Sequence, residues 1–332
     1  MPELRKDPVT GRWVIISTDR QKRPNDFMLA PASVIGAPHC PFCPGHEEMT
    51  PPEVLAYREG GERNGPGWSV RVVPNKYPAL VVEGTLDREG EGMFDRMTGI
   101  GAHEVIIDHP VHDRTWATMG VPEIVQVLWA CRERMLDLQR DTRLRYVLVF
   151  KNHGGAAGAT LEHTHTQLVA LPFVPDLVRQ ELAGAREHFR TKERCVFCDI
   201  VRQEVASGRR VVELHPDVVA LSPYAPRVPF ETWLLPRRHE ARFEQASRDT
   251  YHALATVLQG VLRRMDAVLE RPAFNLVVHS MPFGEGDDAQ FHWHVEVLPR
   301  LTRSAGFESG TGVCINPTAP EEATDVLRAA NI

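Results

Sequence analysis

Short runs of β-branched and aromatic residues, bounded by turn-forming residues, recur along the whole chain and predict strands. The predicted strands are 13–17, 69–73, 103–107, 146–150, 166–170, 211–214, 218–221, 231–235, 275–278 and 294–298. Segments 123–140 and 248–269 carry apolar residues at helical spacing and predict two long helices. Because the strands are not separated by crossover helices, we expect mostly antiparallel pairing with helices on one face, an α+β fold. Segments 38–62 and 84–101 are rich in Gly, Pro and charge and are predicted loops.

One pattern of cysteines and histidines occurs twice along the chain. Each copy contains a Cys-x-x-Cys pair, then an isolated histidine, then a His-x-His motif. The isolated histidine precedes the motif by 51 residues in the first copy (163 − 112) and by 53 in the second (292 − 239). These near-equal intervals indicate an internal duplication, with one domain over 1–185 and a second over 186–332.

Both copies carry the ligand types that zinc prefers. Zinc takes four tetrahedral ligands, and two thiolates at Cys-x-x-Cys spacing can reach one ion. The predicted ligand sets are Cys40, Cys43, His112 and His163 for the first ion and Cys195, Cys198, His239 and His292 for the second. Other histidines compete for these assignments by position, namely His39, His46, His103, His109, His153 and His279. Four protein ligands would close each site, so the two zinc ions are expected to be structural.

The first His-x-His motif also predicts a reaction site. In an extended strand the side chains of His163, His165 and Gln167 share one face. His165 is not needed as a ligand and fits a nucleophile, while the Gln167 amide can donate to a phosphoryl oxygen. The small-residue run 154–160 lets the backbone approach a phosphate, and further donors around it would be Asn152, Gly158 and Thr160.

The second copy differs where this chemistry would suffer. Glu296 stands at the position of Gln167, and segment 283–288 carries acidic residues in place of the Gly/Ala run. Carboxylates facing a phosphate would repel it. We therefore expect one active half and one degenerate half that keeps its metal.

Charge and composition exclude several classes of protein. The 332 residues include 38 Lys and Arg against 44 Asp and Glu, a net charge of −6, without a basic stripe for a nucleic acid. The N-terminus lacks the apolar region of a signal peptide, and no segment is apolar enough to span a membrane. A cytoplasmic location with reduced cysteines is expected, which favours metal binding over disulfides.

The run 150–167, FKNHGGAAGATLEHTHTQ, resembles the active-site segment of the galactose-1-phosphate uridylyltransferase family, the two-domain transferase branch of the histidine triad superfamily. Segments 20–24, 40–43, 73–78 and 306–312 also resemble the corresponding segments of this family. The resemblance implies two tandem histidine-triad-like domains, nucleotide sugar and sugar 1-phosphate as substrates, and a homodimer. It also implies a ping-pong reaction in which His165 takes UMP from UDP-glucose and passes it to galactose 1-phosphate.

The family's pattern also implies roles for individual residues. Arg20, Arg23 and Asn75 would contact the nucleotide or its phosphates, and Asn152, Gly158, Thr160 and Gln167 would surround the transferred phosphoryl group. Two departures are Ala159 and Thr164, where many members have a cysteine and a proline.

The second metal site and the substrate have alternatives. Some members use one glutamate and three histidines, whose equivalents would be Glu181, His279, His292 and His294. The pair at 195 and 198 favours the arrangement shared with ADP-glucose phosphorylases, so an adenylyltransferase is one alternative function. A histidine triad hydrolase and a non-enzymatic zinc-stapled binding module are the others.

Overall fold

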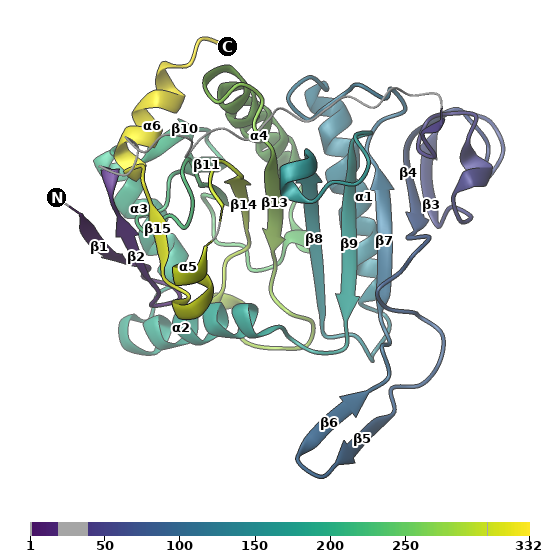
Figure 1. The fold of residues 1–332 in the computed structure, drawn as a ribbon, viewed down its shortest axis with the longest axis horizontal. Helices are drawn as coiled ribbons and strands as arrows, with labels where there is room; N and C mark the ends of the chain where they lie inside the picture. Colours follow the sequence, from purple (N-terminus) through teal and green to yellow (C-terminus); the bar gives the residue numbers. More distant parts are fainter. Residues whose placement is uncertain (1, 19–38, 304) are drawn as a thin grey trace.

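The computed structural model describes residues 2–18, 39–303 and 305–332. Arg20 and Arg23, two predicted phosphate contacts, lie outside the described residues. One ten-stranded sheet forms the centre of the molecule (Figure 1). In spatial order its strands are β10 (Val211–Leu214), β11 (Val218–Leu221), β12 (Thr232–Pro236), β14 (His294–Pro299), β13 (Phe274–His279), β8 (Tyr146–His153), β9 (His165–Leu171), β7 (Ala102–Ile107), β4 (Trp68–Pro74) and β3 (Leu55–Arg58).

The sheet is two half-sheets joined edge to edge. Strands β13 and β8 pair antiparallel at the joint, where Asn275 lies opposite Asn152. Outward from this joint the order β13, β14, β12, β11, β10 in one half corresponds to β8, β9, β7, β4, β3 in the other. All the ladders of this sheet are antiparallel, which confirms the predicted α+β class.

Two long helices cover one face of the sheet. They are α1 (Val121–Leu138) and α4 (Arg248–Val268), close to the predicted bounds, and they also contact each other. Glu123 accepts a hydrogen bond from the Gly120 N–H at the start of α1, and Ser247 caps α4 by accepting one from the Thr250 N–H. Their apolar sides and the inward residues of both half-sheets form one shared core.

The opposite face is covered mainly over the second half-sheet. Helices α2 (Asp176–Lys192) and α3 (Val196–Ser207) pack there against β11 and β12, which the sequence did not predict. Strands β1 (Glu3–Lys6), β2 (Trp13–Ile16) and β15 (Cys314–Asn316) form a small sheet beside them, and β15 runs parallel to β2. Helices α5 (Gly306–Thr311) and α6 (Pro320–Ala329) complete the C-terminal part.

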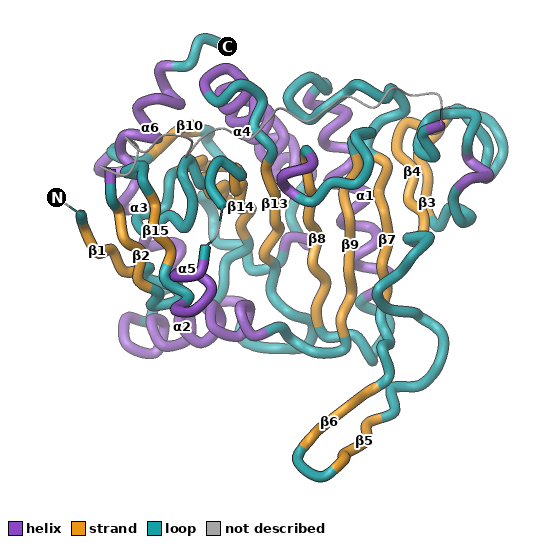
Figure 2. Tube along the Cα trace, viewed as in Figure 1, coloured by secondary structure: helices purple, strands orange, loops and turns teal. Residues whose placement is uncertain are grey.

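The two predicted loops contain regular structure. Strand β3 lies within 38–62. All four of its side chains are half-buried, so its sequence shows no clear alternation of apolar and polar residues. Strands β5 (Arg88–Glu91) and β6 (Phe94–Met97) form a hairpin within 84–101 that projects from the body (Figure 2). Short 3-10 helices are η3 (Glu47–Met49), η4 (Gly155–Ala157), η5 (Phe243–Gln245) and η6 (Asp288–Gln290). Within the described ranges, no helix combines the length and apolar content of a membrane span.

Candidate active site and metal centres

Strand β9 carries the predicted nucleophile on the sheet face that α1 and α4 leave uncovered. Leu168 and Ala170 point into the core under these helices, so His165 and Gln167, which alternate with them, face the other way. His163 lies just before the strand begins, and its ring lies against the Cys-x-x-Cys turn.

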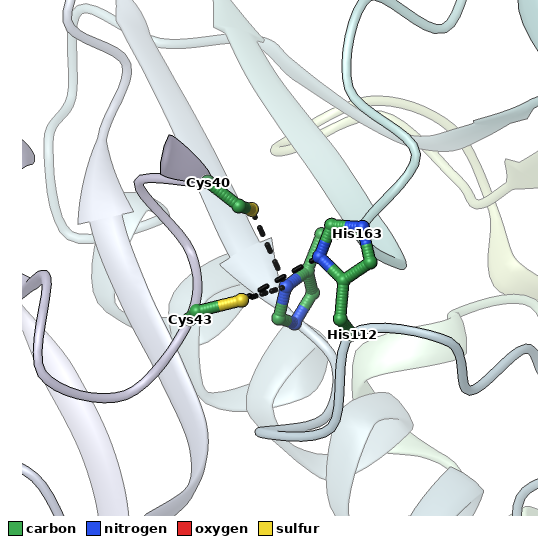
Figure 3. A group of neighbouring side chains, drawn as sticks. All are labelled: Cys40, Cys43, His112 and His163. Atoms are coloured by element: carbon green, nitrogen blue, oxygen red, sulfur yellow. Dashed lines mark hydrogen bonds between the residues drawn. The ribbon is translucent and has the colours of Figure 1, made fainter. Parts of the chain in front are cut away.

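The first predicted ligand set comes together around one point (Figure 3). The Nδ1 atom of His163 lies 3.5 Å from the Sγ atoms of both Cys40 and Cys43, and His112 Nδ1 lies 3.5 Å from the Cys43 Sγ. Ligands at about 2.3 Å (sulfur) and 2.0 Å (nitrogen) from a tetrahedral zinc ion are themselves about 3.5 Å apart. The cluster is therefore compatible with zinc.

Hydrogen bonding prepares the His163 ring for a metal. Its Nε2 donates to the His109 carbonyl at 2.7 Å, which leaves the lone pair on Nδ1, the atom facing the thiols. Burial lowers the pKa of His163 to about 4, so the ring is neutral at pH 7.

The second ligand set repeats this arrangement. The Cys198 Sγ lies 3.3 Å from the Nδ1 of His239 and 3.5 Å from the Nδ1 of His292, with Cys195 in the same cluster. Each ring also donates its Nε2 proton to a backbone carbonyl, His239 to Asp288 at 2.8 Å and His292 to Pro236 at 2.9 Å. This cluster, too, is compatible with zinc.

The ring of His165 is held in one tautomer. Its Nδ1 lies 2.8 Å from the carbonyl oxygen of His163. Because a carbonyl only accepts, Nδ1 carries the proton and the lone pair is on Nε2. Burial and the nearby Lys151 ammonium lower the pKa of His165. The Phe42 and His165 rings pack edge to face, with their centroids 5.4 Å apart. The ring is thus neutral and fixed in orientation, as the predicted nucleophile requires.

His103 orients Gln167 and lies next to Asn75, and its role was missed in the sequence. The Ala79 N–H donates to its Nδ1 at 3.3 Å, so its proton is on Nε2, which donates to the Gln167 Oε1 at 2.9 Å. The Asn75 Nδ2 lies 3.1 Å from the same nitrogen, a contact between two donors and not a hydrogen bond. With its oxygen occupied by His103, Gln167 has its amide NH₂ group left to donate.

The Gly/Ala run forms a tight loop after β8 that includes η4. Gly154 (φ 80°) and Gly158 (φ 89°) adopt positive φ values that side chains disfavour. Asn275, from the second half, donates to the Asn152 Oδ1 at 2.7 Å and to the Ala157 carbonyl at 2.9 Å, and in turn accepts from Arg300. The second half therefore shapes the loop of the first. Thr160 lies at the exposed end of this loop.

A buried lysine fixes the backbone of His165 from the helix side. The Lys151 Nζ donates to the Asp108 Oδ2 (2.7 Å), the Thr164 Oγ1 (2.8 Å) and the His165 carbonyl (2.8 Å). Trp116 donates to the same Asp108 oxygen at 2.8 Å. A charged pair at 1% and 0% side-chain exposure has little freedom to move. The sequence signal for it was a single lysine in an apolar strand.

The second His-x-His motif has a different environment. The potential metal-binding atoms of Glu181, His279, His294 and Glu296 lie within 4.8 Å of one another. The alternative ligand set with one glutamate and three histidines included His292. The structure places His292 in the cluster with Cys195 and Cys198 instead. Burial lowers the pKa of His279, but the carboxylates of Glu181 and Glu296 outweigh this effect and raise the pKa to about 10. Glu296 also pairs with Arg227. The residue equivalent to Gln167 is thus engaged in a buried ion-pair network.

Fold and site together define an α+β protein built on a duplicated antiparallel half-sheet, with an oriented histidine and two Cys/His clusters. The family model "Galactose-1-phosphate uridyl transferase, N-terminal domain" matches residues 1–175, and the C-terminal domain model matches 181–309. The chain belongs to the galactose-1-phosphate uridyl transferase family, which confirms the resemblance inferred from its motifs. It is therefore an enzyme of the nucleotidyltransferase class.

Individual relatives are similar over their full length. ADP-glucose phosphorylase of Arabidopsis thaliana is 34% identical over all of this chain and 93% of its own. Galactose-1-phosphate uridylyltransferase of Thermotoga maritima is 29% identical over all of this chain and 99% of its own. The crystal structure of the A. thaliana ADP-glucose phosphorylase with bound ADP-glucose superposes with a TM-score of 0.85, at 32% identity and full coverage of both chains.

Proposed function

We propose that the protein transfers UMP from UDP-glucose to galactose 1-phosphate through a covalent nucleotidyl intermediate on His165. The observation that carries this proposal is the hydrogen bond from the His165 Nδ1 to the His163 carbonyl, because it directs an unprotonated Nε2 away from the backbone. The Cys/His cluster holds His163, and with it the carbonyl that orients the nucleophile.

The reaction divides into two displacements at phosphorus. The Nε2 lone pair of His165 attacks the α-phosphorus, an N–P bond forms, the bond to the bridging oxygen breaks, and glucose 1-phosphate leaves. A phosphate oxygen of galactose 1-phosphate then attacks the same phosphorus, the N–P bond breaks, and the ring returns to neutral. The nucleotidyl imidazole is a cation that keeps its Nδ1 proton, and the His163 carbonyl stabilises it.

Donors around the phosphoryl oxygens complete the proposed site. The Gln167 amide, oriented by His103, would donate to one oxygen, with Asn152, the Gly158 backbone and Thr160 on the loop side. Asn75, Arg20 and Arg23 would contact the nucleotide or its phosphates. We infer further that domain 1–185 carries the chemistry and domain 186–332 supports it. The homodimer implied by the resemblance stays a prediction.

Zinc at both Cys/His clusters is part of the proposal. Cys40→Ser is expected to lower zinc from two ions per chain to about one and to reduce Tm by several degrees, because a structural zinc links the turn at 40–43 to His163. Metal analysis by mass spectrometry and calorimetry would measure both. Cys314→Ser, outside the two clusters, is the matched control and should keep both values. Two zinc ions and an unchanged Tm in Cys40→Ser would contradict the assignment.

A second candidate reaction is the transfer of AMP from ADP-glucose to phosphate. The observation that favours it is the 34% identity over the whole chain to the A. thaliana ADP-glucose phosphorylase. The chemistry at His165 is the same in both reactions, and only the base and the acceptor differ.

One labelling experiment tests the mechanism and selects the base. The protein is incubated with UDP-glucose or ADP-glucose labelled at the α-phosphate and separated without acid, which would cleave an N–P bond. We expect label on the protein from one donor, and its loss when galactose 1-phosphate or inorganic phosphate is added. Label from ADP-glucose alone selects the second candidate, and no label from either donor overturns the covalent mechanism.

A further inference from the structure

A cavity of about 340 Å³ lies in the second half of the molecule, away from His165. Its apolar walls come from α3, β11 and β12, with Ile200, Leu221 and Trp233 among them. Strand β12 is separated from β9 by β14, β13 and β8, so four inter-strand spacings place the cavity about 19 Å from the nucleophile's strand. The proposed transfer does not use it.

The register of the duplicated sheet relates this cavity to the reaction site. In the first half, Gln167 lies opposite Val105, which lies opposite Val73 on the next strand. In the second half, Glu296 lies opposite Trp233, which lies opposite Leu221 on the next strand. Trp233 and Leu221 therefore correspond to Val105 and Val73. Two residues after Leu221, Pro223 also lines the cavity, at the position that Asn75 has after Val73. The cavity is therefore the second copy's counterpart of the surface beside Gln167 and Asn75.

The carboxylate of Glu204 borders the cavity but is engaged within the protein. Glu204 is 4% exposed, and its Oε1 accepts from Arg210 at 2.6 Å. The walls that a ligand would contact are therefore mainly the apolar ones.

The charges near the mouth argue against a phosphate group. Asp7 accepts from Arg12, and Asp199 accepts from His188, so these charges are compensated within the protein. Lys6 is the remaining cation of the lining. A second cavity of about 460 Å³ shares Lys6, Asp7 and His188 with the first and leads outward along α2. The pair offers an apolar slot with a polar, nearly neutral extension.

We infer that this cavity binds an uncharged nucleoside, with its base between Leu221, Ile200 and Trp233. The slot volume falls at the lower end of the roughly 300–1,000 Å³ usual for small-molecule sites, which suits a base and ribose rather than a whole nucleotide sugar. The second half would thus keep a nucleoside site after losing the reaction.

Saturation-transfer NMR on the full chain tests this inference with adenosine and uridine as probes. At least one nucleoside should give a saturation-transfer signal that persists in excess UMP, which occupies the reaction site through its phosphate. Ile200→Trp fills the slot and should abolish that signal. The rate of nucleotidyl transfer in this variant should stay at the wild-type value. Leu177→Trp, at an exposed position of α2, is the matched control and should keep the signal.

The outcomes separate this site from the reaction site. Loss of every nucleoside signal in UMP, or an unchanged signal in a folded Ile200→Trp variant, would overturn the inference. Should Ile200→Trp lose its cooperative unfolding transition, the smaller variant Ile200→Phe decides: nucleoside affinity should fall at least about tenfold, and unchanged affinity overturns the site. Neither readout depends on whether His165 forms the covalent intermediate.

Discussion

His165→Gly is expected to lower the rate of nucleotidyl transfer by about 10⁴-fold or more, the order of effect seen when a covalent nucleophile is removed. The neighbouring donors can still bind the phosphate, but the His163 Nδ1 lone pair faces the thiols of Cys40 and Cys43 and cannot replace the lost nucleophile. The variant should bind the nucleotide sugar and yet retain no label on the protein. Steady-state rates and the labelling assay measure both effects.

The metal content of this variant distinguishes the two histidines of the motif. His163 holds the cluster through Nδ1, whereas His165 contacts only the His163 carbonyl through its own Nδ1. Zinc should therefore stay at the wild-type value in His165→Gly. His252→Gly, at an exposed position of α4, is the matched control and should keep its transfer rate. Equal zinc loss in His165→Gly and Cys40→Ser would contradict this division of roles.

Lys151→Met is expected to destabilise the fold by about 3–5 kcal/mol, because it leaves the Asp108 carboxylate buried without its cation. Methionine has a similar volume, so the loss reports the charge pair and not a cavity. Urea unfolding measures the free energy. The transfer rate of the folded fraction should fall too, because the His165 carbonyl loses the ammonium that fixes it.

A partner substitution separates charge from packing. In the double variant Lys151→Met with Asp108→Asn the uncompensated charge is gone, so part of the lost stability should return. Lys192→Met on the surface of α2 is the control and should change stability by less than about 0.5 kcal/mol. A single Lys151→Met variant as stable as that control would show that the pair contributes nothing net.

Periodicity predicted the core elements well because burial constrains them. The strands of the sheet other than β3, and helices α1 and α4, carry continuous apolar faces, so their sequences show the period of the element. Helix α2 buries only Val178, Leu182 and Ala185, too narrow a stripe to stand out. Every residue of the hairpin strands β5 and β6 is exposed, which leaves no burial signal.

By itself the sequence determined the duplication, the fold class, the Cys/His sets and the family, because these depend on residue types at fixed spacings along the chain. Only the tertiary structure decided which groups serve the site without belonging to a motif. His103, Asp108 and Asn275 reach it from other strands or from the other half of the chain. Their contacts are set by strand order and register across the joined sheet, and no spacing within a motif encodes that order.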